Sequence, residues 1–249
     1  MSAEFDTIAE WTARVAMDLG SDYRIPAACR GSGSPSALDW LLDRLGLAPG
    51  QSLLDCGAGV GGPAAYAVKK KSIRPILVEP EGGACRAARA LFGHPVVQGS
   101  ASELPIMDES FDAAWSLGVL CTMSDQPALL SELRRITRPG GRVGLLVFMA
   151  RTSKELDSPA GNDFPTEDRL LGLVDDAGLN IETRRGTHGL PPTPPDWEER
   201  EQAVNDELNR RYADTQAWQL AERQGELIGR LLADHSVSGE LLILRRPHS

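Results

Sequence analysis

Residues 53–63 read Leu-Leu-Asp-Cys-Gly-Ala-Gly-Val-Gly-Gly-Pro, a short apolar run that passes into glycines and ends at a proline. The apolar run predicts a buried strand, and proline is well tolerated in the first turn of a helix. Glycines at such a junction remove the Cβ atoms that would keep a ligand away from the backbone. We therefore interpret Gly57, Ala58 and Gly59 as a ligand-binding turn, although a glycine-rich turn can also simply join a strand to a helix.

Short apolar runs and amphipathic stretches alternate around this turn. Strands are predicted at Ser52–Asp55, Ile76–Glu79, Pro95–Val97, Asp112–Ser116, Val143–Phe148, Asn180–Arg185 and Leu241–Arg246. Helices are predicted between them at Pro63–Lys70, Gly82–Phe92, Gln126–Thr137 and Pro165–Ala177. This order predicts an α/β fold, Rossmann-like and doubly wound, with a seven-stranded, mostly parallel sheet and helices on both faces. Such a fold binds its ligand at the carboxyl ends of the strands.

Further helices flank the alternating region. Apolar spacing predicts a helix over residues 5–19, with Thr12 on its apolar face, then a loop and a second helix over residues 34–46. Residues 187–195 hold four prolines, and residues 196–234 read as one or two long polar helices. We expect a single domain over residues 1–249. Its expected parts are N-terminal helices (1–46), a cofactor-binding core (47–186), a helical cap insertion (187–239), and the last strand and tail (240–249).

Two acidic residues restrict the kind of ligand. Asp55 lies at the end of its strand, where a negative charge is unfavourable beside a pyrophosphate and favourable beside an ammonium group. Glu79 ends the next strand, about 20 residues further on, where it can accept hydrogen bonds from ribose hydroxyls. Because sites for NAD share that second feature, an NAD(P)-dependent oxidoreductase remains an alternative.

Four stretches in order carry a family resemblance: LDCGAGVGGP from Leu54, LVEP from Leu77, QGSASELPIMDESFDAAWSLGVL from Gln98 and LRRITRPGGRVGLLVF from Leu133. Together they resemble the class I S-adenosylmethionine-dependent methyltransferases. The GVGGP variant is similar to that of sterol, tocopherol and natural-product methyltransferases. The resemblance implies S-adenosylmethionine as the cofactor, S-adenosylhomocysteine as the product, and a small-molecule methyl acceptor. A module that binds the cofactor without catalysis remains an alternative, because motifs report binding more securely than turnover.

The resemblance also implies roles for particular residues. It places Asp55, Gly57, Ala58 and Gly59 around the methionine moiety and Glu79 on the ribose. The other cofactor-binding residues that it implies are Pro80, Ser100, Ala101 and Ser102 near the adenine, and Ser116 and Leu117 along the methionine and sulfonium portion. Family members commonly have Asp where this chain has Ser100, which can accept a hydrogen bond but carries no charge. Arg30, ahead of the sheet, could pair with the methionine carboxylate or be an ordinary surface arginine.

Methyl transfer from a sulfonium mainly requires that an acceptor be aligned and water excluded, so no universal catalytic residue is expected. If a base is used, His188 is our candidate, because it follows the sixth predicted strand on the ligand side; a surface histidine on a loop is the alternative. Trp197, Tyr212 and Trp218 of the cap either stack on the acceptor or pack the cap onto the sheet. The sequence shows no clear cluster of carboxylates that would suggest a metal site.

Composition narrows the class further. The 249-residue chain has a formal net charge of −9, and its basic run Lys69–Lys71 lies at the predicted end of a helix, so we expect no nucleic-acid partner. The sequence has no apolar stretch long enough for a membrane span, and its first ten residues lack the pattern of a signal peptide. Four well-separated cysteines predict reduced thiols. We therefore expect a cytoplasmic protein, whose oligomeric state the sequence leaves open.

Overall fold

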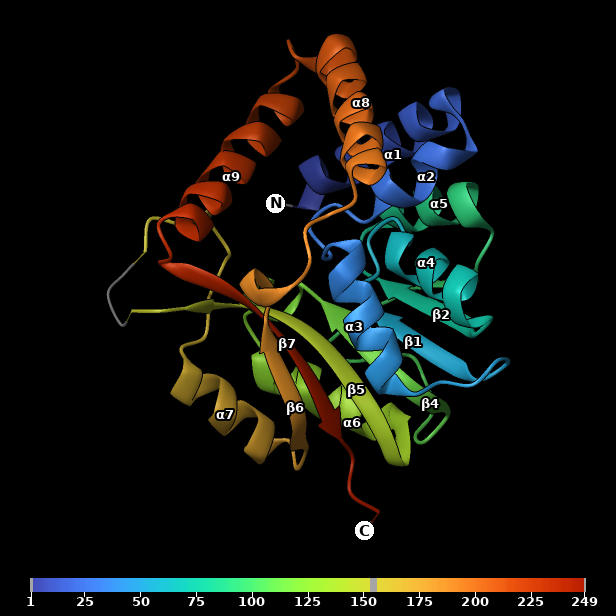
Figure 1. Cartoon of the computed structure of the whole chain (residues 1–249), viewed down its shortest axis with the longest axis vertical. Helices are drawn as coiled ribbons and strands as arrows, with labels where there is room; N and C mark the ends of the chain where they lie inside the picture. Colours follow the sequence, from blue (N-terminus) through green and yellow to red (C-terminus); the bar gives the residue numbers. More distant parts are fainter. Residues whose placement is uncertain (1, 153–155, 249) are drawn as a thin grey trace.

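The structure is a computed structural model that describes residues 2–152 and 156–248. Its centre is a seven-stranded sheet in the order β3-β2-β1-β4-β5-β7-β6 (Figure 1). The strands are β1 (Ser52–Cys56), β2 (Arg74–Glu79), β3 (Val96–Gln98), β4 (Phe111–Leu117), β5 (Thr137–Ala150), β6 (Asn180–Gly186) and β7 (Val237–Arg245). The first five strands pair in parallel, whereas β7 runs antiparallel between β5 and β6. The predicted mostly parallel α/β sheet is confirmed.

Helices cover both faces of the sheet. On one face, α6 (Gln126–Ile136) and α7 (Glu167–Asp176) contribute to a core cluster that includes Leu54 and Leu145. On the other face, α3 (Pro35–Leu45) and α4 (Gly62–Lys71) pack on Leu53 and Trp115. Adjacent strand residues point to opposite faces, so this pair of clusters follows from the apolar runs in β1 and β4. Helix α5 (Gly82–Phe92) packs beside α4 over Leu77.

Four further helices form a layer above one end of the sheet (Figure 1). They are α1 (Ser2–Leu19), α2 (Ser21–Ala28), α8 (Pro195–Tyr212) and α9 (Gln216–Ala233). All four contribute to one apolar cluster, which also contains residues of α5. The segment predicted to form one or two long helices before the last strand forms two, α8 and α9, and they pack with the N-terminal helices. Trp218 is buried in this cluster and Tyr212 stacks on Trp11, so both serve packing rather than an open surface.

An aspartate fastens α1 to α5. The Asp6 carboxylate accepts hydrogen bonds from the backbone N–H groups of Gly83 (2.7 Å) and Ala84 (3.4 Å), in the first turn of α5. These N–H groups have no partner within the helix, and the positive end of the helix dipole favours the charge. Nearby, the Glu10 carboxylate pairs with Arg86 at 2.6 Å. The N-terminal helix is therefore held against the sheet's ligand-binding edge by polar contacts as well as by burial.

The structure corrects three boundaries. Residues 21–28 form helix α2, although a loop was predicted there because of Pro26 and the neighbouring glycines. Strand β5 begins at Thr137, before the RPGG stretch that was expected to precede it; Thr137 pairs with Phe111, and the register then shifts so that Arg142 pairs with Ala113. Strand β7 begins at Val237, four residues earlier than predicted, because it pairs with β5 as far as Ala150.

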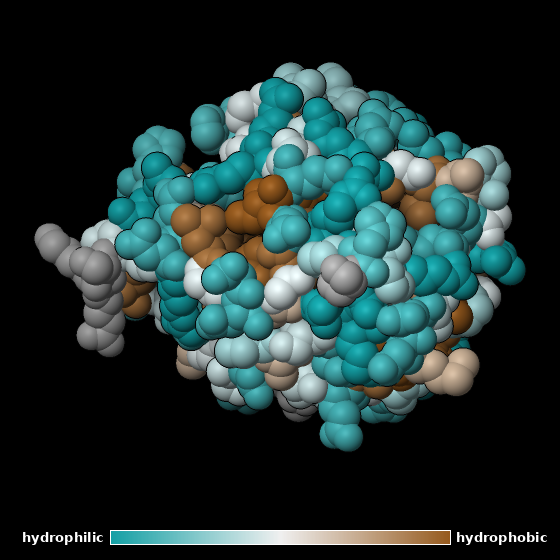
Figure 2. Space-filling model, turned by 90° about the horizontal axis from the view of Figure 1, so that it is seen from below, coloured by the Kyte–Doolittle hydropathy of each residue, from teal (hydrophilic) through white to brown (hydrophobic). Residues whose placement is uncertain are grey.

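The outer surface fits the acidic composition. Seen from below, most of the surface is hydrophilic, with apolar side chains gathered in a hollow towards the left of the view (Figure 2). None of the helices within residues 2–152 and 156–248 is long and apolar enough to span a membrane.

Candidate functional site

A cavity of about 590 Å³ lies over the carboxyl ends of β1, β2 and β4. Its floor is the glycine turn and the strand ends, and its walls come from α1, α2, the loop after α2, and α9. The lining residues are Glu4, Phe5, Ile8, Ala9, Thr12, Ala27, Ala28, Arg30, Gly31, Ser32, Gly57, Ala58, Gly59, Val60, Glu79, Pro80, Glu81, Ser100, Ala101, Leu117, Gly118, Val119, Thr122, Met123, Ala221 and Gln224. The predicted ligand edge of the sheet therefore does carry a cavity.

The glycine turn is built for close approach. Gly57 and Gly59 have φ of +73° and +53°, a conformation that side chains disfavour. A Cβ atom on Gly57 would lie 2.4 Å from a methyl group of Val119, which also lines the cavity. The N–H groups of Gly57 and Ala58 both donate to the Val78 carbonyl, so neighbouring strand β2 holds the turn. Both glycines are thus required by the backbone that forms the cavity floor.

Asp55 is a buried carboxylate beneath this turn. Its side chain is 1% exposed, and no described residue donates a hydrogen bond to its Oδ2 atom. Burial raises the pKa of Asp55 to about 7; the Trp115 side chain opposes the shift, and the charge of Glu79 adds to it. An unpaired buried charge is costly, whereas a cationic ligand group would compensate it. Asp55 carries the charge that an ammonium group would need, but it is not among the residues that line the cavity, so its ammonium-binding role stays a prediction.

Glu79 connects the glycine turn to the end of β2. Its Oε2 atom accepts from the Gly59 N–H at 2.8 Å and its Oε1 atom accepts from the Glu81 N–H at 3.1 Å. Burial raises the pKa of Glu79, although these two hydrogen bonds act in the opposite direction. Each carboxylate oxygen can accept a second hydrogen bond, so Glu79 can still bind hydroxyl groups of a ligand in the cavity.

Three predicted cofactor residues have local partners instead. The Ser116 hydroxyl is buried and donates to the Cys56 carbonyl at 3.0 Å, which ties β4 to β1 outside the cavity lining. Ser102 is likewise absent from the lining, and its N–H donates to the Ser100 hydroxyl oxygen at 3.2 Å. Ser100 does line the cavity, with its hydroxyl 2.8 Å from that of Ser102. The other predicted residues, Pro80, Ala101 and Leu117, line the cavity as expected.

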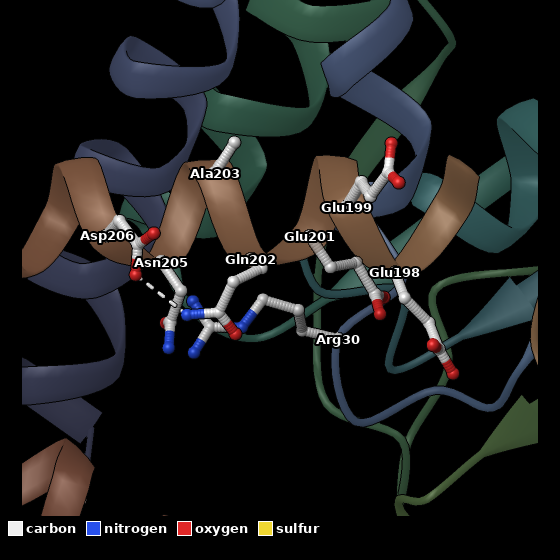
Figure 3. Close-up of a pocket in the computed structure, with 8 residues that line it drawn as sticks. All are labelled: Arg30, Glu198, Glu199, Glu201, Gln202, Ala203, Asn205 and Asp206. Carbon is white, nitrogen blue, oxygen red and sulfur yellow. Dashed lines mark hydrogen bonds between the residues drawn. The ribbon is translucent and has the colours of Figure 1, made fainter. Parts of the chain in front are cut away.

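Arg30 lies between two cavities. It lines the cavity of about 590 Å³ over the strand ends, which we call the main cavity. It also lines a second cavity, of about 700 Å³, along α8. Figure 3 shows its side chain extended along α8, with the guanidinium end beside Gln202 and Asn205. Burial lowers the pKa of Arg30, and the charges of Glu222 and Glu201 act in the opposite direction. Arg30 is thus placed where it can reach a carboxylate in the main cavity, but acidic residues of α8 and α9 compete for it.

The candidate base His188 lies in a short 3-10 turn after β6, and it is not part of the cavity lining. Its ring packs close to Gly186 at the end of that strand. No histidine occurs among the described lining residues. Cys121, near the end of β4, is buried, and burial raises the pKa of its thiol to about 11, so it is not a thiolate at neutral pH. Within residues 2–152 and 156–248, no group of three or more His, Cys, Asp or Glu residues is placed to hold a metal ion.

Most of the residues that line the cavity were not predicted as site residues from the sequence. Phe5, Ile8, Ala9 and Thr12 lie on one face of α1, at the spacing that a helix places on one side. The same spacing predicts burial in a core equally well, so periodicity alone could not separate the two. On α9, Ala221 and Gln224 show the same ambiguity.

The chain was compared with families and proteins of known type. Residues 54–145 match a family described as a methyltransferase domain. Methyltransferase GfsG of Streptomyces halstedii is 29% identical over 158 residues, which are 57% of each chain. Demethylmenaquinone methyltransferase of Mycobacterium sp. (strain JLS) is 33% identical over 119 residues, 44% of this chain and 47% of the relative. The chain thus spans about half the length of these curated relatives.

Solved structures agree on the fold. The [4+2]-cyclase SpnF superposes with a TM-score of 0.67 at 24% identity, covering 85% of this chain and 80% of that one. Geranyl diphosphate C-methyltransferase from Streptomyces coelicolor A3(2), in complex with Mg²⁺, geranyl diphosphate and S-adenosyl-L-homocysteine, superposes with a TM-score of 0.61 at 20% identity, covering 84% and 77%. Together with the ordered motifs and the matched methyltransferase domain, these findings support the class I S-adenosylmethionine-dependent methyltransferase family as the one that this chain resembles.

Proposed function

We propose that this protein transfers a methyl group from S-adenosylmethionine to a small-molecule acceptor. The observation that carries the proposal is the buried Asp55 carboxylate, whose Oδ2 lacks a hydrogen-bond partner among the described residues beneath a glycine-floored cavity. Dinucleotide sites place phosphates at this turn, and a buried carboxylate would repel them. A ligand with an ammonium group and a ribose instead suits Asp55 and Glu79 together.

The chain's own residues divide the binding between them. Asp55 would pair with the ammonium group, Glu79 would accept from the ribose hydroxyls, and Gly57 and Gly59 would allow the backbone to approach. Pro80, Ser100 and Ala101 would border the adenine. Arg30, which lines the cavity, is our candidate partner for the carboxylate. Ser102 and Ser116 would support the site through Ser100 and Cys56 rather than by contact.

The bound cofactor would supply an electrophilic methyl group on a sulfonium. The protein then has to hold the acceptor in line and keep water away. The apolar walls from α1 and α9 are placed for that task. Because His188 lies outside the lining, its role as a base stays a prediction. We expect an acceptor whose attacking atom is already nucleophilic or is deprotonated by a group of the cavity itself.

Isothermal titration with S-adenosylmethionine, S-adenosylhomocysteine and NADH tests the proposal first. We expect the first two to bind in the micromolar range and NADH not to bind. Binding of NADH alone would overturn the proposal in favour of an oxidoreductase. A second assay measures transfer of radiolabelled methyl groups to a panel of alcohols, phenols, amines and activated carbon acids. Cofactor binding without transfer to any of them would favour the non-catalytic module.

A further inference from the structure

Thr12 presents a hydroxyl group that the protein does not use. Its side chain is only 5% exposed and lines the main cavity from α1. Within the described part of the chain, no hydrogen bond involves the Thr12 hydroxyl. Two other threonines behave differently: Thr137, fully buried directly after α6, donates to the Leu133 carbonyl at 2.7 Å, and Thr122 donates to the Val119 carbonyl at 2.8 Å. A hydroxyl that the protein leaves without a hydrogen bond and that lines a cavity is available to a ligand in that cavity.

Gln224, on α9, is a second polar side chain that lines the cavity without a hydrogen bond to the described residues. It lies half-buried among the apolar residues Ala221, Leu227 and Ile228, at positions that share one face of the helix. Its side chain lines the cavity and has no hydrogen bond to any of the described residues. Gln219, on the same helix, instead donates to the Ala213 carbonyl at 3.1 Å. Two cap helices thus each contribute one polar group to the same cavity.

The surroundings of these two groups are apolar. Phe5, Ile8 and Ala9 lie on the Thr12 face of α1, and Val119 and Met123 follow β4 on the opposite wall. Such a lining binds hydrophobic surface and leaves orientation to a few polar groups. The polar groups available here are a hydroxyl and a carboxamide, both uncharged at every ordinary pH.

The charges at this cavity disfavour an anionic acceptor. Glu4, Glu79 and Glu81 line it, and Arg30 is the one basic residue among the described lining residues. Arg30 is itself flanked by Glu201 and Glu222. A diphosphate or carboxylate acceptor close to the Glu79 carboxylate would therefore be repelled, whereas a neutral molecule would not.

We propose that the space between α1 and α9 is the acceptor site, and that it takes an apolar molecule bearing an uncharged oxygen group, a hydroxyl or a carbonyl, recognised by Thr12 and Gln224. This inference rests on the proposed function, because it assigns the remaining part of the same cavity. It makes Thr12 and Gln224 specificity-determining residues rather than parts of the cofactor site.

Two series of matched probes test the class of acceptor. The first contains geraniol, 2,6-dimethyl-2,6-octadiene, geranylamine and geranyl diphosphate. The second contains 2-naphthalenemethanol, 2-methylnaphthalene and 2-naphthylmethylamine. Titrated into the full chain saturated with S-adenosylhomocysteine, the alcohol of at least one series should bind about tenfold more tightly than its hydrocarbon. Equal binding of alcohol and hydrocarbon, tightest binding of the diphosphate or an amine, or no binding of either alcohol would overturn the proposal.

Matched variants then test the two residues. Thr12→Val keeps the shape and removes the hydroxyl, and it should weaken binding of the alcohol about tenfold while leaving the hydrocarbon unchanged. Thr12→Ser should retain alcohol binding. Gln224→Leu should act like Thr12→Val, whereas Gln219→Leu, one turn away and facing solvent, should change neither affinity. Alcohol binding that Thr12→Val and Gln224→Leu leave intact would contradict the assignment.

The affinity for S-adenosylhomocysteine separates this inference from the proposed function. We expect it to be unchanged within about twofold in Thr12→Val and Gln224→Leu. If these variants lose cofactor and alcohol equally, the two residues belong to the cofactor site and the inference fails while the proposed function stands. If the wild-type chain does not bind S-adenosylhomocysteine at all, the proposed function itself fails.

Discussion

The charged form of Asp55 destabilises the folded protein, because the carboxylate is buried. It lies where we expect a cationic ligand group to bind. Its pKa of about 7, raised above the ordinary value of 3.8 by burial, means that the folded protein binds a proton more tightly than the unfolded chain does. Stability is therefore highest where Asp55 is protonated in both states, and it falls as the pH rises from about 4 to about 7. The full cost, up to roughly 4 kcal/mol, is present above pH 7.

The first prediction concerns Asp55→Asn. This variant should be more stable than the wild type at pH 8, and the difference should shrink as the pH falls through 7 and disappear near pH 4. Thermal unfolding followed by circular dichroism at several pH values measures it. The same variant should bind S-adenosylmethionine at least about tenfold more weakly, through loss of a charge-assisted contact. A variant that is less stable at pH 8 would show that the carboxylate is paired in the folded protein.

Some residues of the site could be predicted and others could not, for a physical reason. Asp55, Glu79 and the turn glycines follow directly from strand ends, because a residue at the end of a parallel strand has its position fixed by the sheet. Ser116 also lies at a strand end, but whether its hydroxyl faces the ligand or the neighbouring strand depends on pairing with β1, which no local pattern contains. Thr12 and Gln224 lie on helices that pack from far along the chain, so their surroundings are set only by the tertiary fold.

Helix α2 could not be predicted from its local sequence. Its eight residues include Pro26 and follow Gly20, both of which are typical of a loop. The helix forms because its last turn packs against the start of α4, where the Gly62 position is so close that a Cβ atom would lie 2.4 Å from the Ala28 backbone carbon. Tertiary contact here outweighs weak helix propensity. Ala27 and Ala28 thereby become part of the cavity wall.

The second prediction tests this contact with two glycine substitutions. Gly62→Ala should destabilise the protein by about 1–3 kcal/mol, because the atoms in the way belong to backbone and cannot rotate aside. It should also weaken cofactor binding, since α2 must move. Gly172→Ala, in the exposed part of α7 with no atom within 4 Å of the new Cβ, should instead stabilise by up to about 1 kcal/mol. Urea unfolding of both variants measures the difference, and equal effects would contradict the close contact.

The third prediction concerns the attachment of α1 to α5. Asp6→Ala should cost about 1 kcal/mol of stability, because two N–H groups of α5 lose their acceptor. Since α1 carries Phe5, Ile8 and Thr12 into the cavity, the variant should also weaken ligand binding. Asp6→Asn, which can still accept hydrogen bonds, should lose less. Calorimetric unfolding with and without S-adenosylhomocysteine measures both effects; a loss of stability that leaves ligand binding untouched would mean that α1 stays in place without Asp6.

On the scale of the whole molecule, two helices far apart in the sequence, α1 and α9, both contribute walls to the cavity. Helix α1 begins at Ser2 and α9 ends at Ala233, yet both line the same space and share an apolar cluster. The sequence suggested a separate cap over residues 187–239. In the structure Val204, Leu208 and Trp218 of that segment are buried against α1 and α2, so its removal would also uncover the N-terminal helices. Deletion of Pro191–Asp234 is therefore a poorer test of acceptor binding than substitutions within it.

The fourth prediction is that ligand binding orders this upper layer as one unit. The helices α1, α2 and α9 contribute walls to the cavity, whereas α7 and β6 contribute no residue to the lining described here. Saturation with S-adenosylhomocysteine should therefore slow amide hydrogen exchange in α1, α2, α9 and the glycine turn, and leave α7 and β6 unchanged. At a concentration one hundred times its Kd, the ligand should add about 2.7 kcal/mol of stability and raise Tm by roughly 5–10 °C. Protection confined to the glycine turn would mean that α9 closes only on the acceptor. Mass-spectrometric exchange on the complexes with S-adenosylhomocysteine alone and with the alcohol added would then show which ligand protects α9.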